Sequence, residues 1–258
     1  KNGIDEQTAN KIYDEMTDFA KYAFNKSHAA AYAVISVQTA WLKFYYPVEF
    51  MAALMTSVID NSAKAAEYLL HCKELGISVL PPDINVGQGE FTAEGNAVRY
   101  GLYAIKSLGR PVIDSIIGER KKGGSYRTLQ DFIERTVQRD INKRAIENLI
   151  KAGACDGLDG NRHQMSIVYT SMVVRRKKTG LEGQMSLFDF VGEEDKKDYE
   201  VHYPNVEEFP KEVLLGFEKE VLGIYLSGHP LEDYLGKMKK NVTANAADFG
   251  KRKAAQFV

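Results

Sequence analysis

The sequence predicts a mainly α-helical protein with one small β-hairpin, and three observations support this fold class. Apolar residues recur at helical spacing through the first eighty or so residues. A short β-branched segment and a glycine turn then interrupt the pattern between residues 77 and 100. From there to about residue 159, short helical segments alternate with glycine-containing turns. The apolar runs are too short to cross a bilayer, so we expect no transmembrane helix.

Four helices are expected in the amino-terminal part. A polar break at residues 25–28 separates the first two, and the third is apolar nearly all round and should be buried. Proline can begin a helix because its missing N–H is unpaired there anyway, whereas glycine suits the residue after a helix end. Residues of the types that cap or delimit helices stand at the expected ends: Asp5, Pro47, Asn61 or Ser62, and Gly76.

The β-hairpin is expected where residues 91–93 and 97–100 flank the turn sequence Glu94-Gly95-Asn96. Beyond residue 159, the basic run at 175–178 begins a polar stretch that we interpret as a linker. The remaining segment turns acidic and contains a further helix that ends near Gly228.

Charge is unevenly distributed, although 34 Lys and Arg residues nearly balance 35 Asp and Glu residues for a net charge of −1. Residues 99–151 carry twelve basic against six acidic side chains, whereas residues 191–220 carry four against ten. A basic module of small helices and glycine turns suits a ligand with a phosphate backbone. The two cysteines, Cys72 and Cys155, exclude a disulfide scaffold and fit a reducing cytoplasm.

The first motif is Asn25-Lys26-Ser27-His28, at a predicted helix start. Helix starts present free N–H donors and a partial positive charge, to which lysine adds a full charge, so this motif suits a phosphate. The alternative is a simple Ser27 cap beside a solvated lysine and a satisfied histidine.

The second motif is a pair of candidate helix-hairpin-helix units, at residues 105–113 and 141–154. Small residues in such a turn let the backbone N–H groups approach a DNA phosphate closely. Arg120, Lys121 and Lys122 add counter-charge nearby, and the alternative is an ordinary helical subdomain with a solvated surface. The expected DNA-binding residues are Lys106, Ser107, Leu108, Gly109, Arg110, Lys143, Arg144 and Gly153.

The third motif, Gln184-Met185-Ser186-Leu187-Phe188, follows a charged, glycine-containing stretch and resembles the short peptide by which bacterial replication proteins bind the sliding clamp. Two large apolar side chains in a polar stretch are exposed unless a partner covers them. Leu187 and Phe188 would fill an apolar pocket on the clamp, and Gln184 would set the register, with Ser186 between them. Alternatively, the apolar residues of this stretch pack onto their own domain.

Several chemical classes are excluded by the sequence. The five His and two Cys residues form no zinc-ligand spacing, and neither a Walker loop nor a dinucleotide glycine fingerprint occurs. No Asp-x-Asp pair occurs either, so the carboxylates that two-metal phosphoryl transfer requires are missing. We therefore assign no catalytic residue and no metal ligand.

Together, these motifs resemble the bacterial C-family replicative DNA polymerases, the alpha subunits of DNA polymerase III. The resemblance extends over nearly the whole chain as far as Lys240, with two departures, Ala23 and Ser107, where the family often has glycine. The segments that carry it occur in the family's order: residues 24–32, 38–39, 46–53, 80–85 and 223–231.

The resemblance implies a domain order. Residues 1–80 would be the carboxyl-terminal part of the polymerase fingers, and residues 81–160 a tandem helix-hairpin-helix DNA-binding domain. Residues 161–195 would be a linker that contains the clamp-binding peptide, and residues 196–258 an acidic, helical connector leading toward an OB domain.

The resemblance also implies a function, as part of a cytoplasmic DNA-directed DNA polymerase that transfers nucleotidyl groups from deoxynucleoside triphosphates. Asn25, Lys26, Ser27 and His28 would contact the incoming nucleotide, and the hairpin turns would hold duplex or primer–template DNA. Residues 184–188 would bind the sliding clamp (the beta subunit), with further holoenzyme subunits as partners. The parent enzyme would use magnesium, but this segment binds no cofactor, lacks the palm carboxylates and is expected to be inactive alone.

Two rival hypotheses are a non-enzymatic helix-hairpin-helix scaffold that binds DNA and the clamp, and a generic helical protein. A scaffold has no use for a triphosphate-facing Lys-Ser-His at a helix start, and the generic protein does not account for the charge split.

Overall fold

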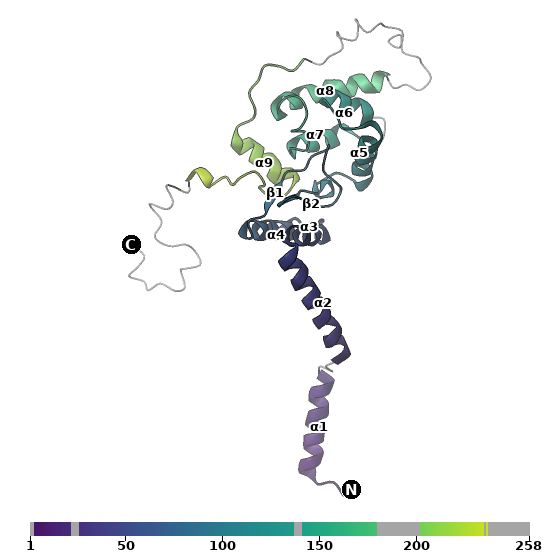
Figure 1. Ribbon diagram of the computed structural model, residues 1–258, viewed down its shortest axis with the longest axis vertical. Helices are drawn as coiled ribbons and strands as arrows, with labels where there is room; N and C mark the ends of the chain where they lie inside the picture. Colours follow the sequence, from purple (N-terminus) through teal and green to yellow (C-terminus); the bar gives the residue numbers. More distant parts are fainter. Residues whose placement is uncertain (1–2, 22–25, 137–140, 180–201, 235, 237–258) are drawn as a thin grey trace. The chain divides into compact units, whose positions relative to one another are not determined.

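The computed structural model describes residues 3–21, 26–136, 141–179, 202–234 and 236 (Figure 1). Its contacts divide the chain into two compact units, residues 1–50 and residues 51–258. Residues 51–80, which the sequence analysis grouped with the preceding helices, thus lie in the same unit as the basic module.

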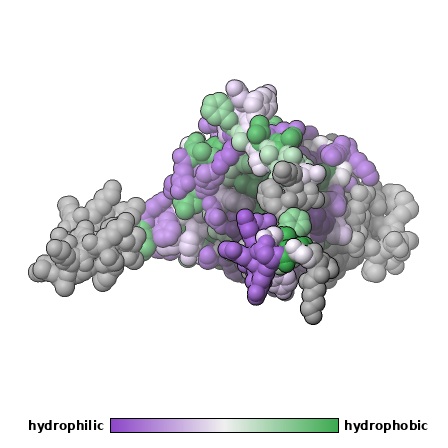
Figure 2. Space-filling view, turned by 90° about the horizontal axis from the view of Figure 1, so that it is seen from below, coloured by the Kyte–Doolittle hydropathy of each residue, from purple (hydrophilic) through white to green (hydrophobic). Residues whose placement is uncertain are grey.

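The first unit contains two long helices, α1 (Glu6–Lys21) and α2 (Lys26–Tyr45). Asp5 caps α1 as expected, because its Oδ1 accepts a hydrogen bond from the Thr8 N–H at 2.9 Å. The apolar stripe of α1 is not buried by any described element of this unit, since Met16 and Phe19 are about two-thirds exposed. Figure 2 shows hydrophobic side chains (green) at the surface beside hydrophilic ones (purple).

The second unit begins within α3 (Pro47–Ser57), which Pro47 starts as predicted, and continues into α4 (Ser62–Glu74). Asn61 is the α4 cap and accepts the Lys64 N–H, whereas Gly76 adopts a φ of 72° just beyond the helix end. Met51 and Met55 of α3 are fully buried, so one face of α3 belongs to the core. Ala53 and Ser57 are exposed, so α3 is not buried all round as the sequence predicted.

A three-stranded sheet follows, with strand order β1-β3-β2. β3 (Ala97–Arg99) is central and pairs antiparallel with β2 (Thr92–Glu94) and parallel with β1 (Ser78–Leu80). Gly95 has a φ of 59° in the tight turn between β2 and β3, a conformation that glycine adopts without steric cost. The predicted hairpin is therefore confirmed, and β1 joins it from the β-branched segment.

The helical core of the second unit packs beside this sheet. Within it, α8 lies against α6 and α7, and α5 lies against α6 (Figure 1). Fully buried apolar side chains, among them Ile113, Phe132 and Ile146, come from different helices and meet in this core. The bounds are η1 (Leu102–Ala104), α5 (Arg110–Gly123), α6 (Leu129–Thr136), α7 (Lys143–Lys151), α8 (Arg162–Thr179), α9 (Lys211–Val221) and η4 (Glu232–Tyr234).

Two details differ from expectation. The helix before the first hairpin turn is only a single 3₁₀ turn, η1, and the stretch predicted as linker from residue 161 begins with the packed helix α8. α8 is held to the later chain by Glu208, whose carboxylate accepts the N–H groups of Arg162 and His163 at 2.9 and 3.0 Å. Asn161 also caps α8 locally, because its Oδ1 accepts the Gln164 N–H at 2.8 Å, so a local and a distant residue share the first N–H groups of this helix.

Both cysteines are buried free thiols. Of the helices in the described ranges, none combines the length and the apolar character needed to cross a membrane.

Two glycine substitutions should affect stability in opposite directions. A Cβ on Gly101 would lie 2.7–2.8 Å from backbone atoms of residues 89–91, so Gly101→Ala should destabilise the fold by about 1–3 kcal/mol through overpacking. A Cβ on Gly118, inside α5, would meet no atom within 4 Å, so Gly118→Ala should stabilise the fold by up to about 1 kcal/mol. Urea denaturation of the two variants measures both changes, and a stable Gly101→Ala protein would contradict the close packing.

Candidate nucleic-acid interface

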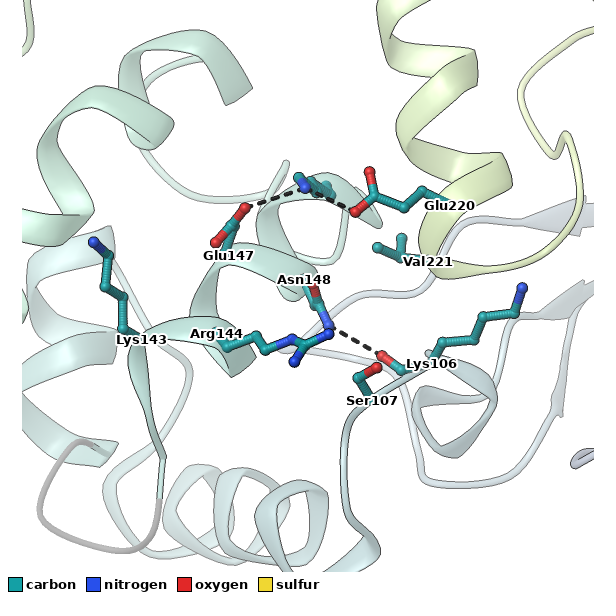
Figure 3. A pocket seen from close by; sticks show the side chains of 9 residues that line it. Lys106, Ser107, Lys143, Arg144, Glu147, Asn148, Glu220 and Val221 are labelled. Atoms are coloured by element: carbon teal, nitrogen blue, oxygen red, sulfur yellow. Dashed lines mark hydrogen bonds and ion pairs between the residues drawn. The ribbon is translucent and has the colours of Figure 1, made fainter.

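A cavity of about 580 Å³ lies where the turn before α5, one face of α7 and the end of α9 come together (Figure 3). Its walls carry cationic side chains on one side and an acid–base cluster on the other. The lining residues are Lys106, Ser107, Lys143, Arg144, Glu147, Asn148, Lys151, Glu220 and Val221.

The turn at this cavity has an unusual backbone. Ser107 has a φ of 61°. Among the described residues, it is the only one other than glycine with a positive φ. This left-handed conformation costs a residue with a Cβ about 1–2 kcal/mol. Ser107 and Gly109 are exposed, and neither N–H makes a hydrogen bond within the described ranges. The turn therefore presents backbone donors to solvent.

Hydrogen bonds from two distant elements hold this turn. The Lys106 N–H donates to the Val221 carbonyl at the end of α9 at 2.8 Å. The Lys106 carbonyl accepts a hydrogen bond from Asn148 Nδ2 on α7 at 3.1 Å (Figure 3). Asn148 is only 7% exposed, so this contact is shielded from water.

The cationic wall is the start of α7. Asn142 caps the helix by accepting the Ala145 N–H at 2.9 Å, and Lys143 and Arg144 occupy the first two helical positions. The first turn contains no acidic residue, so the partial positive charge of the helix start adds to two full charges. Among the described residues, neither side chain has a carboxylate within 4 Å, and Lys143 Nζ lies 5.8 Å from the Tyr169 ring centroid.

The opposite wall is electrostatically compensated. Lys151 Nζ lies 3.1 Å from Glu147 Oε1 and 3.0 Å from Glu220 Oε1. Burial alone would lower the pKa of Lys151, but its hydrogen bonds to Glu220 and Glu147 outweigh burial and raise the pKa above its ordinary value. Lys151 therefore stays charged, with both carboxylates as its partners, and the positive potential of the cavity comes from the α7 start.

The structure brings together Lys106, Ser107, Lys143 and Arg144, four of the eight residues predicted to bind DNA. Leu108 and Gly109 follow them in the same turn, and Gly109 is the residue that precedes α5. The sequence separates these groups by more than thirty residues, and the packing of α7 against the turn joins them.

Arg110 and Gly153 lie outside the cavity lining. The Arg110 guanidinium stands 4.9 Å from the Tyr103 ring centroid and 3.6 Å from an Asp60 carboxylate oxygen. Gly153 is buried, and its N–H donates to the Ile150 carbonyl at 3.0 Å, so that donor is already used.

Arg120, predicted to supply counter-charge, also has a structural contact. Its Nη1 donates to the carbonyls of Ile84 and Gly87, both at 2.8 Å, and thereby ties α5 to the segment that leads into the hairpin.

Sequence reasoning did not single out Asn148 or Glu220. A signal existed for Asn148, because residues 144, 148 and 151 share one helix face at spacings of four and three. For Glu220 no local signal existed, because α9 reaches this site only through tertiary packing.

The remaining predicted residues are outside this cavity or outside the described ranges. Ser27 and His28 are exposed in the first turn of α2, and the His28 ring lies 4.4 Å from the Tyr32 ring centroid. Asn25, the Lys26 side chain and the predicted clamp-binding residues Gln184, Ser186, Leu187 and Phe188 lie outside the described part.

Comparison with known proteins places a family match over this region. Residues 76–165 match a helix-hairpin-helix motif. The DNA polymerase III alpha subunit of Vibrio cholerae is 43% identical over 244 residues, which cover 93% of this chain and 21% of that protein. The corresponding subunit of Borreliella burgdorferi is 43% identical over 91% of the chain, and that of Escherichia coli 41% identical over 94%. The chain spans about a fifth of the length of these curated relatives.

Proposed function

We propose, from the premise that this chain is a segment of the DNA polymerase III alpha subunit family, that it holds duplex DNA for a replicative polymerase through the cavity at the Ser107 turn. The observation that carries the proposal is the pairing of exposed turn N–H groups with a cationic helix start inside a helix-hairpin-helix match. Such a surface fits the backbone phosphate of a nucleic acid.

The chemistry of the cavity favours contacts that do not depend on sequence. Phosphate oxygens can be bound by the backbone N–H groups, by the helix start and by the charges of Lys143 and Arg144. None of these groups distinguishes one base from another. A replicative polymerase must bind every sequence it copies, so a phosphate-directed grip suits that task.

The parent enzyme would transfer nucleotidyl groups from deoxynucleoside triphosphates to a primer end in the cytoplasm, together with other holoenzyme subunits. In this proposal the start of α2, with Lys26, Ser27 and His28, faces the incoming nucleotide, and residues 184–188 bind the sliding clamp. Tethering to a clamp makes each rebinding to DNA intramolecular and so raises processivity.

Magnesium, which the family implies, does not fit the described residues of this chain. Among them, no three His, Cys, Asp or Glu side chains are grouped so that they could hold a metal ion. We therefore derive no catalytic step from this segment.

Loss of the cationic helix start should weaken duplex binding in a salt-dependent way. We expect Lys143→Ala/Arg144→Ala to reduce the slope of log affinity against log salt by about two, because each phosphate contact contributes roughly 0.9 to that slope. The measurement is fluorescence anisotropy with labelled duplexes of two unrelated sequences. The matched control is Lys64→Ala/Lys73→Ala, which removes the same charge at exposed positions on α4, outside the predicted DNA-binding residues. Equal slopes for the two double variants, or a loss confined to one duplex sequence, would count against the proposal.

The clamp-binding peptide can be tested by truncating its apolar side chains. Leu187→Ala/Phe188→Ala should abolish capture of this chain by immobilised sliding clamp, because buried apolar anchors dominate peptide affinity and cost about 2 kcal/mol or more each when truncated. Leu181→Ala, in the same stretch but outside the motif, should leave capture intact. Retention of full capture by the double variant would refute the tether.

The nucleotide contact requires the parent polymerase. In the full-length enzyme, Lys26→Ala should raise the apparent KM for deoxynucleoside triphosphates by on the order of tenfold, since a charge-assisted contact contributes about 1.5–3 kcal/mol. Lys11→Ala, on the exposed surface of α1, is the control and should leave KM unchanged. Steady-state primer extension measures both, and an unaltered KM for Lys26→Ala would remove this residue from the site.

A further inference from the structure

We propose that Asn148 is a positioning residue that sets the geometry of the phosphate-binding turn through the Lys106 carbonyl. The second half of the helix-hairpin-helix module would thereby control the turn in the first half. This inference rests on the proposed DNA-binding function and adds a residue that does not itself touch the phosphate.

The placement of Asn148 is unexpected on packing grounds. The other buried residues of α7 are apolar: Ala145, Ile146, Leu149 and Ile150. Asn148 is only 7% exposed, yet its side chain is a polar amide. Burying an amide costs free energy unless it is hydrogen-bonded, and an apolar side chain would fill the same space at no such cost. The hydrogen bond from Nδ2 to the Lys106 carbonyl at 3.1 Å accounts for the amide.

That hydrogen bond orients the donor on the other side of the same peptide group. The Lys106 carbonyl and the Ser107 N–H belong to one planar trans unit, so they point in opposite directions. When Asn148 holds the carbonyl toward α7, the Ser107 N–H is turned away from Asn148 and is left without a partner within the described residues. The Asn148 amide therefore sets the direction in which the Ser107 N–H points.

The same contact explains why a serine adopts a glycine-like conformation. The Lys106 N–H is bonded to the Val221 carbonyl and its C=O to Asn148, so the peptide groups on both sides of Lys106 are held where the chain enters Ser107. The chain must then turn into Gly109 and α5, and it does so with a φ of 61° at Ser107. Without the Asn148 contact, the strain at Ser107 would drive the turn toward negative φ and redirect its N–H groups.

This mechanism predicts that the importance of Asn148 depends on the residue at position 107. Glycine adopts positive φ as readily as negative φ, so in a Ser107→Gly background the turn keeps its shape at less cost. A residue that only stabilises the fold would show no such dependence, because its effect would add to that of Ser107→Gly.

The experiment is a double-mutant cycle on the 258-residue chain, measured as the affinity for a fluorescein-labelled duplex at several salt concentrations. We expect Asn148→Ala to weaken binding by on the order of tenfold, and Ser107→Gly to bind at least as tightly as the original chain. In the Ser107→Gly/Asn148→Ala protein the loss should shrink to roughly threefold or less.

Two further variants separate positioning from folding. Asn148→Leu keeps the branched shape and the number of side-chain heavy atoms and removes the donor, so it should weaken binding like Asn148→Ala while remaining folded by circular dichroism. Asn161→Ala removes a similar contact away from the cavity, from Asn161 Nδ2 to the Val206 carbonyl at 3.0 Å, together with the cap that Asn161 Oδ1 gives the Gln164 N–H. It therefore tests for a general loss of stability, and it should leave affinity unchanged.

Wild-type affinity in both Asn148 variants, or an equal loss in the original and the Ser107→Gly backgrounds, would overturn the positioning role while leaving DNA binding in place. Failure of the unmodified chain to bind the duplex at low salt would instead overturn the proposed function itself.

Discussion

The hairpin turn at Ser107 depends on tertiary hydrogen bonds that hold the peptide groups on both sides of Lys106. The Lys106 N–H donates to the Val221 carbonyl, and the Asn148 amide donates to the Lys106 carbonyl. Both α9 and α7 are therefore needed to build a turn that precedes them in the chain. A serine with positive φ persists only when the contacts around it hold the backbone in that conformation. The cavity beside this turn is therefore a product of the whole second unit rather than of a local motif.

The acidic segment that follows the basic module has a structural part in that unit. Glu220 pairs with Lys151 at one wall of the cavity, and Glu208 accepts the free N–H groups at the start of α8. Within α9, Glu218 is 2% exposed, and its carboxylate accepts the N–H groups of Leu226 and Ser227. The carboxylates of Glu208, Glu218 and Glu220 thus accept hydrogen bonds from groups within this unit. Among the described residues, they do not pair with the cations at the start of α7.

Several elements were predictable because their signals are local. Asp5 and Asn61 cap helices through side-chain contacts three residues away, Pro47 starts α3, and Gly95 forms the tight turn between β2 and β3. Each of these depends on backbone conformation within a few residues, which the residue type itself favours. The apolar stripes of α1 and α2 were also predicted as helix faces, but periodicity does not say what covers a face, and within their own unit they remain exposed.

The candidate site was only partly predictable. The sequence by itself determined the residue types that address a phosphate, namely the small turn residues around Ser107 and the cations Lys106, Lys143 and Arg144. Only the tertiary structure decided which of them share a cavity, placing Arg110 over Tyr103 and Gly153 in the interior instead. It also supplied Asn148 and the end of α9, whose contacts join residues far apart in sequence. The physical reason is that residue type determines what a group can bind, whereas the direction in which it points depends on the packing of distant helices.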